Sequence, residues 1–213
     1  MKKRILSLAL SAAMALTMLP TGAFAASDKG KPPVYNQATG CYEISTPDQL
    51  LYLSGSWKDG APRDGHYVLT ADIDMTGVKG FKPIASKKDQ GFIGTFDGQF
   101  HAIKGLRVEY EKKYAGLFGY VGNQDDQAYI KDVALLNCYV TGQQNVGALA
   151  GVNYGTITGC VVTGEVKCLD LSNSHTAGGI CGKLKEGEGP IVGHVEDCYI
   201  NADVSAPYDA GGV

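Results

Sequence analysis

The sequence predicts an all-β protein whose short strands stack as the coils of a parallel β-helix. Three observations lead to this prediction: an excess of glycine, a recurring apolar phrase bounded by glycine, and a recurring phrase around cysteine. The chain has 29 glycines in 213 residues, about twice the usual share of ~7%. Such an excess indicates many turns, and therefore short strands rather than long helices.

The glycine-bounded phrase occurs three times, and the end of the sequence, 211–213, resembles the start of a fourth copy. The three copies are Gly116-Leu117-Phe118-Gly119, Ala148-Leu149-Ala150-Gly151 and Gly179-Ile180-Cys181-Gly182. The cysteine phrase reads NCYVTG at 137–142, GCVVTG at 159–164 and DCYINA at 197–202. The spacing of the two phrases gives a unit of 22 residues once polar or Gly/Pro-rich insertions of 9 and 7 residues are removed.

A unit of this size cannot bury its apolar face alone. Stacking the units about 4.8 Å apart pairs each strand with its copies above and below, and buries a continuous core. Leu117, Leu149 and Ile180 would then form one inward column, and Cys138 and Cys160 are candidates for another. Stacked cysteines are expected as small buried hydrophobes, with disulfides as the alternative in an exported chain.

With these phrases the sequence resembles the GLUG-repeat family of bacterial cell-surface proteins, named for glycine-leucine-hydrophobic-glycine. Residues 116–119 match that pattern directly, whereas Ala148 and Ile180 depart from it. Residues 42–106 look like the region that commonly precedes such repeats, so the resemblance covers roughly 42–213. It implies a right-handed β-helix, and it implies little about activity because most members have unknown functions.

The N-terminal region is predicted to direct export. Residues 1–25 combine a basic start, an apolar run and small residues before a cleavage point, which is the pattern of a cleavable signal peptide. Residues 26–40 are interpreted as a flexible leader and 41–106 as an N-terminal cap with the first coils. Residues 107–213 form the repeat region, which we expect to be truncated within a copy at its C-terminus.

A short capping helix is predicted within the cap. Residues 46–49 form a capping box with proline at the first helical position, so a helix should run from Pro47 to about Ser54. Its apolar residues can cover the open first coil and protect it from edge pairing. These residues are Leu50, Leu51 and Leu53.

Charge and hydropathy exclude two classes of partner. The net charge is −3 without a basic cluster, which gives nucleic acid no surface to bind. No segment after the signal peptide approaches the 18 apolar residues of a spanning helix, so no membrane span is predicted. We therefore expect a secreted or cell-surface location.

Asp97 and His101 are an acid and an imidazole four residues apart, in a glycine-rich stretch. The glycines exclude a helix that would place both side chains on one face. Asp97-Gly98 instead predicts a turn in which the carboxylate accepts backbone N–H groups, with His101 on the returning strand. A catalytic pair is the alternative.

Asp72 and Asp74 are the other candidate carboxylates, because residues two apart share one face of a strand. Together with Asp97 they form the candidate site for cleavage of a glycosidic bond. Such chemistry needs two carboxyl groups about 5 to 9.5 Å apart and one raised pKa. Alternation with Ile73 and Met75 explains both carboxylates equally well as solvent-facing positions.

Other chemistry has weaker support in the sequence. Nucleophile, metalloprotease and phosphate-loop motifs are absent, the histidines at 66, 101, 175 and 194 are far apart, and no cofactor or metal site is predicted. Calcium at 122–127 is an alternative that rests on Asp125 and Asp126 alone. Stacked tyrosines can bind sugar rings or a protein partner, although half-buried strand positions also favour tyrosine. The tyrosines concerned are Tyr110, Tyr114, Tyr120, Tyr129, Tyr139, Tyr154 and Tyr199.

The function predicted from these observations is a non-catalytic exported surface module, an adhesin or a structural scaffold. The alternative is a β-helix carbohydrate-active enzyme, or the accessory domain of one. The candidate partners are a glycan or a surface protein of the host or the bacterium. End-to-end self-association through an open last coil is a further prediction.

Overall fold

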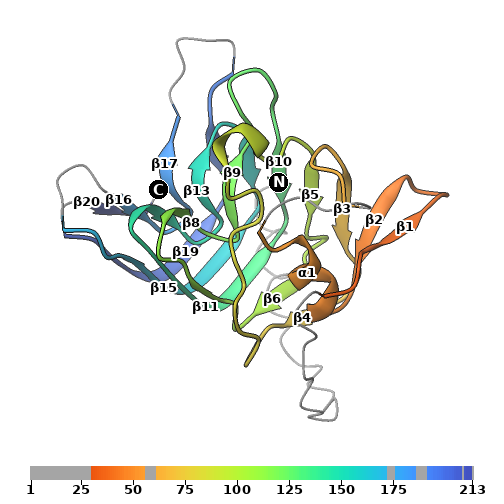
Figure 1. Ribbon diagram of the computed structural model, residues 1–213, viewed down its shortest axis with the longest axis horizontal. Helices are drawn as coiled ribbons and strands as arrows, with labels where there is room; N and C mark the ends of the chain where they lie inside the picture. Colours follow the sequence, from red (N-terminus) through yellow and green to blue (C-terminus); the bar gives the residue numbers. More distant parts are fainter. Residues whose placement is uncertain (1–29, 56–60, 172–175, 186–190, 208, 213) are drawn as a thin grey trace, which may run out of the picture.

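The computed structural model describes residues 30–55, 61–171, 176–185, 191–207 and 209–212. The predicted signal peptide, the start of the leader, His175 and Val213 lie outside the described residues. The described residues form twenty β-strands, one α-helix and one 3-10 turn, η1 (Lys88–Gln90), so the protein is all-β as predicted (Figure 1).

The strands are arranged in four sheets. Sheet 1 contains, in spatial order, β1 (Val34–Asn36), β2 (Cys41–Ile44), β3 (His66–Leu69), β5 (Thr95–Asp97), β10 (Tyr129–Lys131), β14 (Thr156–Thr158) and β18 (His194–Glu196). Sheet 2 contains β4 (Ile73–Asp74), β6 (Ala102–Lys104), β11 (Ala134–Gly142), β15 (Val161–Cys168) and β19 (Tyr199–Ser205), and β7 (Arg107–Glu109) also pairs with β11. Sheet 3 contains β8 (Lys113–Ala115), β12 (Gln144–Gly147), β16 (Thr176–Gly178) and β20 (Asp209–Gly211). Sheet 4 contains β9 (Phe118–Val121), β13 (Ala150–Asn153) and β17 (Cys181–Leu184).

The chain visits these sheets repeatedly in one order. Strands β10, β11, β12 and β13 belong to sheets 1, 2, 3 and 4, and β14 to β17 and then β18 to β20 follow the same sequence. We call each such passage a round. The described pairs between successive rounds are parallel, because each strand returns to its sheet in the same direction.

The predicted column of apolar residues is confirmed. Register pairs Phe118 with Ala150 and Ala150 with Cys181, which are 32 and 31 residues apart. Leu117, Leu149 and Ile180 precede these residues in the three copies, and all three are fully buried. Backbone hydrogen bonds connect them from round to round, with the Leu149 N–H donating to the Ile180 carbonyl at 3.0 Å.

The predicted unit of 22 residues is wrong, and so is the column of Cys138 above Cys160. Register pairs Cys138 with Gly164, whereas Val161 pairs with Tyr199. Cys160 therefore lies beside Cys198, one round later, and not beside Cys138.

A shared local conformation explains the misleading cysteine phrase. Asn137, Gly159 and Asp197 each precede a cysteine, and each has a positive φ, of 53°, 63° and 50°. Gly159 and Asp197 turn the chain from sheet 1 into sheet 2, whereas Asn137 lies inside β11, where its register shifts. The phrase marks a left-handed residue followed by a cysteine, which occurs both at the corner between sheets 1 and 2 and at the register shift within β11.

The last glycine of each motif copy allows close approach of the preceding round. A Cβ on Gly151 would lie 2.5 Å from the Cα atom of Tyr114, and one on Gly182 would lie 2.2 Å from the backbone carbon of Asn145. Gly119 is similarly close to the backbone of the previous round. Glycine is needed here because no side chain fits between the two segments of backbone.

Helix α1 (Pro47–Leu53) confirms the predicted cap. Thr46 Oγ1 accepts the Gln49 N–H at 3.3 Å, and Gln49 Oε1 accepts the Thr46 N–H at 3.2 Å, which completes the capping box. Leu50 and Leu53 are buried in the core, and Leu51 packs against it. Among the described residues, no helix has the length and hydropathy to span a membrane.

The flexible leader predicted for residues 26–40 is wrong in its second half. β1 pairs antiparallel with β2, and the Tyr35 ring lies 4.9 Å from that of Tyr42. The turn between these strands is stabilised by Asn36 Oδ1, which accepts the Ala38 N–H, and by Gly40 at φ 70°. Polar and glycine residues that suggested flexibility therefore form a hairpin turn.

Candidate functional site

The structure brings Asp72, and not Asp97, to His101. Asp72 Oδ1 lies 3.4 Å from His101 Nδ1 and accepts the Ala102 N–H at 3.0 Å. Asp72 Oδ2 forms an ion pair with Lys104 Nζ at 2.8 Å. These contacts connect β6 to the residue that precedes β4, so Asp72 joins two neighbouring strands of sheet 2.

Neither Asp72 nor Asp74 has the raised pKa that a general acid requires. Burial alone would raise the pKa of Asp72, but hydrogen bonds from Lys104 and the Ala102 N–H outweigh it and lower the pKa below its ordinary value. Hydrogen bonds from Thr76 lower the pKa of Asp74. Both groups are therefore ionised at neutral pH, which does not suit protonation of a glycosidic oxygen.

Asp97 stabilises a corner of the fold. Its carboxylate accepts the Gln99 N–H at 2.8 Å and forms an ion pair with Lys131 at 2.8 Å. The turn after Asp97 does not produce a hairpin, because β5 belongs to sheet 1 and β6 to sheet 2. The partners of Asp97 are thus separate from those of Asp72 and Asp74.

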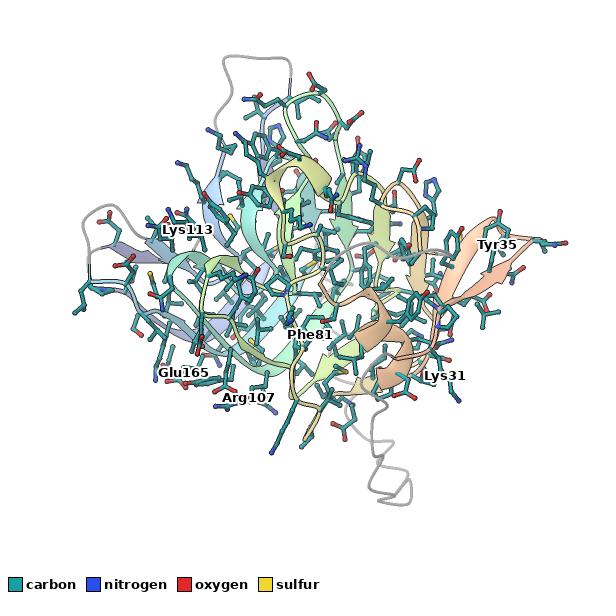
Figure 2. All side chains as sticks on the ribbon, in the orientation of Figure 1. Lys31, Tyr35, Phe81, Arg107, Lys113 and Glu165 are labelled. Carbon is teal, nitrogen blue, oxygen red and sulfur yellow. The ribbon has the colours of Figure 1, made fainter. Side chains whose placement is uncertain are left out.

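The outer face of sheet 2 carries a charged ladder around Tyr139. The Arg107 guanidinium lies 4.1 Å from the centre of the Tyr139 ring, and Lys167 Nζ lies 5.8 Å from it. Each cation is also paired with a carboxylate, Arg107 with Glu109 and Lys167 with Glu165. Figure 2 shows Phe81 among the interior side chains, with Arg107 and Glu165 at the periphery. Because cations approach the Tyr139 ring, it is a poor platform for a sugar ring.

Three of the tyrosines gather at sheet 4. Tyr120 and Tyr154 are buried with Val152 in a small cluster that is separate from the main core, and Tyr114 and Ile191 pack against it. The rings of Tyr114 and Tyr120 are 4.8 Å apart, and burial raises the pKa of Tyr120. The exposed Tyr129 and Tyr199 lie elsewhere, in sheets 1 and 2.

A hollow of about 310 Å³ lies next to this cluster. It lies along the corner where the chain passes from sheet 4 to sheet 1, because its residues precede β3, β5, β10 and β14. Its lining residues are Arg63, Lys88, Asp89, Asn123, Gln124, Asp125, Asp126 and Tyr154. We call this feature the corner hollow.

The 122–127 segment gives the corner hollow an ordered wall. Asn123 Oδ1 accepts the N–H groups of Asp125 and Asp126, both at 2.7 Å, and Asn123 Nδ2 donates to Asp126 Oδ2 at 3.0 Å. The Asn123 N–H also donates to the Asp126 carbonyl. Within the described ranges, no group of three or more His, Cys, Asp or Glu side chains is arranged to hold a metal ion.

Sequence reasoning missed Arg63, Lys88 and Asp89 as members of this site. They lie more than 20 residues from the 122–127 segment and belong to no motif. Arg63, the pair Lys88 and Asp89, and the 122–127 segment meet because these three segments lie at the same corner of successive rounds. Arg63, Lys88 and Asp89 could have been identified only by aligning the successive rounds in their correct register.

Comparisons with known proteins identify relatives that share part of this chain. Halomucin of Haloquadratum walsbyi is 32% identical over 151 residues, which cover 66% of this chain and 2% of halomucin. A protein named as a Gly-rich membrane protein, from Evansella cellulosilytica, is 33% identical over 101 residues, which cover 43% of this chain and 11% of that protein. The chain therefore spans a small fraction of both relatives. No family model matches it.

A solved structure resembles the fold. A crystal structure from Bacteroides ovatus, named as an immunoglobulin A1 protease, aligns with a TM-score of 0.57 and 23% identity. The alignment covers 76% of this chain and 47% of that chain. At this level of identity the likeness concerns the fold alone.

Proposed function

We propose that this chain is a non-catalytic module of an exported cell-surface protein, and that the corner hollow binds a glycan. The module is a right-handed parallel β-helix of the GLUG-repeat type. The observation that carries the binding proposal is the corner hollow itself, which is lined by charged, hydrogen-bonding side chains on rigid corners. The relatives named halomucin and Gly-rich membrane protein, although each is matched over a small part of its length, support the location.

The order of the strands supports the β-helix. The rounds β10–β13 and β14–β17 each place one strand in every sheet, and successive rounds pair in parallel, as coils of a solenoid do. Leu117, Leu149 and Ile180 of the motif stack in one column, and the motif glycines allow close contact between rounds. Such a framework holds surface loops in fixed positions, which lowers the entropic cost of binding.

The chemistry of the corner hollow suits a neutral sugar. Arg63 and Lys88 supply donors, whereas Asp89, Asp125 and Asp126 supply acceptors. Sugar hydroxyls both donate and accept hydrogen bonds, so they can pair with the cationic donors and with the carboxylate acceptors of the lining. An anionic or a cationic ligand would be attracted by one set of these side chains and repelled by the other. Tyr154 also lies in the wall of the hollow, but it is buried and Lys185 Nζ lies 5.8 Å from the centre of its ring, so the polar side chains carry the proposal.

Replacing Arg63 by alanine is expected to weaken glycan binding by about tenfold or more, because hydrogen bonds to charged groups contribute roughly 1.5–3 kcal/mol. A glycan array would identify the ligand, and titration calorimetry would then measure its affinity for each variant. Arg107→Ala is the matched control, because it removes the same side chain from the outer face of sheet 2. Equal affinity of Arg63→Ala and the wild type, or equal losses in both variants, would contradict the proposed site.

End-to-end self-association remains a prediction, and one comparison supports it. The inward residues Val195, Ile200 and Val204 of the last described round are only half-buried. Their counterparts one round earlier, Ile157, Val162 and Val166, are fully buried. The last round therefore exposes apolar surface that a further round or a second copy can cover.

A further inference from the structure

Cys160 and Cys198 are direct neighbours across two rounds of sheet 2. They immediately precede β15 and β19, whose first residues, Val161 and Tyr199, pair in parallel register. The Tyr199 N–H donates to the Cys160 carbonyl at 2.8 Å. Adjacent strands lie about 4.8 Å apart, which is within the Cα separation of about 4.4–6.8 Å that disulfides span.

The two thiols lie at the same corner of successive rounds. Each thiol donates to a backbone carbonyl, Cys160 to Thr158 at 3.3 Å and Cys198 to Glu196 at 3.2 Å, and the Cys160 thiol is placed to donate to Cys198 once Cys198 is a thiolate. Cys160 is fully buried, whereas Cys198 is half-buried at the last strand of the sheet. An external reagent can therefore reach Cys198 first.

The acidities of the two thiols differ in the direction that disulfide formation needs. The hydrogen bond with Cys160 lowers the pKa of Cys198 to about 7, against the opposing effect of burial. The same hydrogen bond, together with burial, raises the pKa of Cys160. Because the thiolate is the nucleophile in thiol–disulfide exchange, Cys198 is the group that reacts first at neutral pH.

The other cysteines are less suitably placed. Cys138 lies opposite Gly164, and the Cys168 thiol donates to the Gln143 carbonyl at 3.1 Å. Cys41 is in β2, at the other end of the molecule. Cys181 is buried, which raises its pKa to about 12, so it is a poor nucleophile although Cys198 is near it.

We propose that Cys160 and Cys198 are a disulfide-forming pair that cross-links the last two described strands of sheet 2. The oxidant is an external disulfide, such as oxidised glutathione. The Cys198 thiolate attacks one sulfur of that disulfide and releases the first thiol, which leaves a mixed disulfide on Cys198. Cys160 then loses its proton and attacks the Cys198 sulfur, which releases the second thiol. Two cysteine thiols are oxidised and one external disulfide is reduced to two thiols.

The cross-link would close a loop between residues 160 and 198. It would stabilise the protein by restricting the unfolded chain. We expect the melting temperature to rise by roughly 5–10 °C on oxidation, because the stabilisation that a disulfide typically provides corresponds to a shift of this size in a chain of this length.

The test compares the reduced full chain with the same protein equilibrated in oxidised glutathione. After alkylation of free thiols, mass spectrometry of the digest should find a peptide pair joined through Cys160 and Cys198, with Cys41 and Cys138 alkylated. The rise in melting temperature should disappear on reduction, should be absent from Cys198→Ser, and should persist in Cys41→Ser.

Three results would overturn the proposal. They are a wild-type protein in which both thiols stay alkylatable, a cross-link from Cys198 to Cys181 or to a second chain, and a stable glutathione adduct on Cys198. The mapping uses wild-type protein, so it decides the question even if Cys198→Ser folds poorly.

Discussion

Replacing Leu149 by alanine is expected to lower the free energy of unfolding by about 2–5 kcal/mol. Leu149 is fully buried in the middle of a column, with Leu117 in the round before and Ile180 in the round after, both also fully buried. The backbone around it is held by hydrogen bonds to both neighbouring rounds. The site cannot collapse around the smaller side chain, so a cavity would remain between three rounds.

Equilibrium unfolding in urea measures this change, and Leu171→Ala is the matched control. Leu171 is 79% exposed, so its truncation should change stability by no more than about 0.5 kcal/mol. Similar effects of the two substitutions would show that Leu149 is not part of a packed column.

Replacing Gly151 by alanine is expected to lower the free energy of unfolding by about 1–3 kcal/mol, because the added methyl group overlaps backbone. A Cβ at this position would lie 2.5 Å from both the Cα atom and the carbonyl carbon of Tyr114. Backbone of a paired strand cannot rotate away as a flexible side chain can. Two rounds would therefore have to separate locally.

Gly212→Ala provides the comparison in the same unfolding experiment. A Cβ on Gly212 would meet only the Cδ1 atom of Ile200, at 3.8 Å, which is an ordinary contact. Stability should be unchanged or slightly increased there, because alanine restricts the unfolded chain. Unchanged stability of Gly151→Ala would refute the close approach on which the motif glycine depends.

The glycine-bounded phrase was the part of the sequence that predicted the fold best. It combines an apolar residue that must face inward with a glycine that lies too close to neighbouring backbone to carry a Cβ, and both constraints recur in the three motif copies. The capping box was equally informative, because Thr46 and Gln49 satisfy each other's backbone groups within four residues. Both patterns can be recognised in the sequence without knowing how the strands of successive rounds pair.

The cysteine phrase misled because a local pattern does not specify where in a round it occurs. Asn137 and Gly159 have the same left-handed conformation, yet Gly159 lies at the corner between sheets 1 and 2 and Asn137 lies within β11. The corner hollow was invisible for a related reason. Arg63 and Asp126 become neighbours only when rounds of unequal length are stacked, and the unequal lengths come from insertions that carry no periodic signal.

The claim that this module binds glycans without cleaving them is tested most directly by release of reducing ends. The wild-type protein would be incubated with the polysaccharide that it binds best, alongside Asp72→Asn and Asp74→Asn. Because the pKa values of Asp72 and Asp74 are both lowered, we expect no release by any of the three proteins. Release by the wild type that is lost in either variant would contradict the account and identify a carbohydrate-active enzyme.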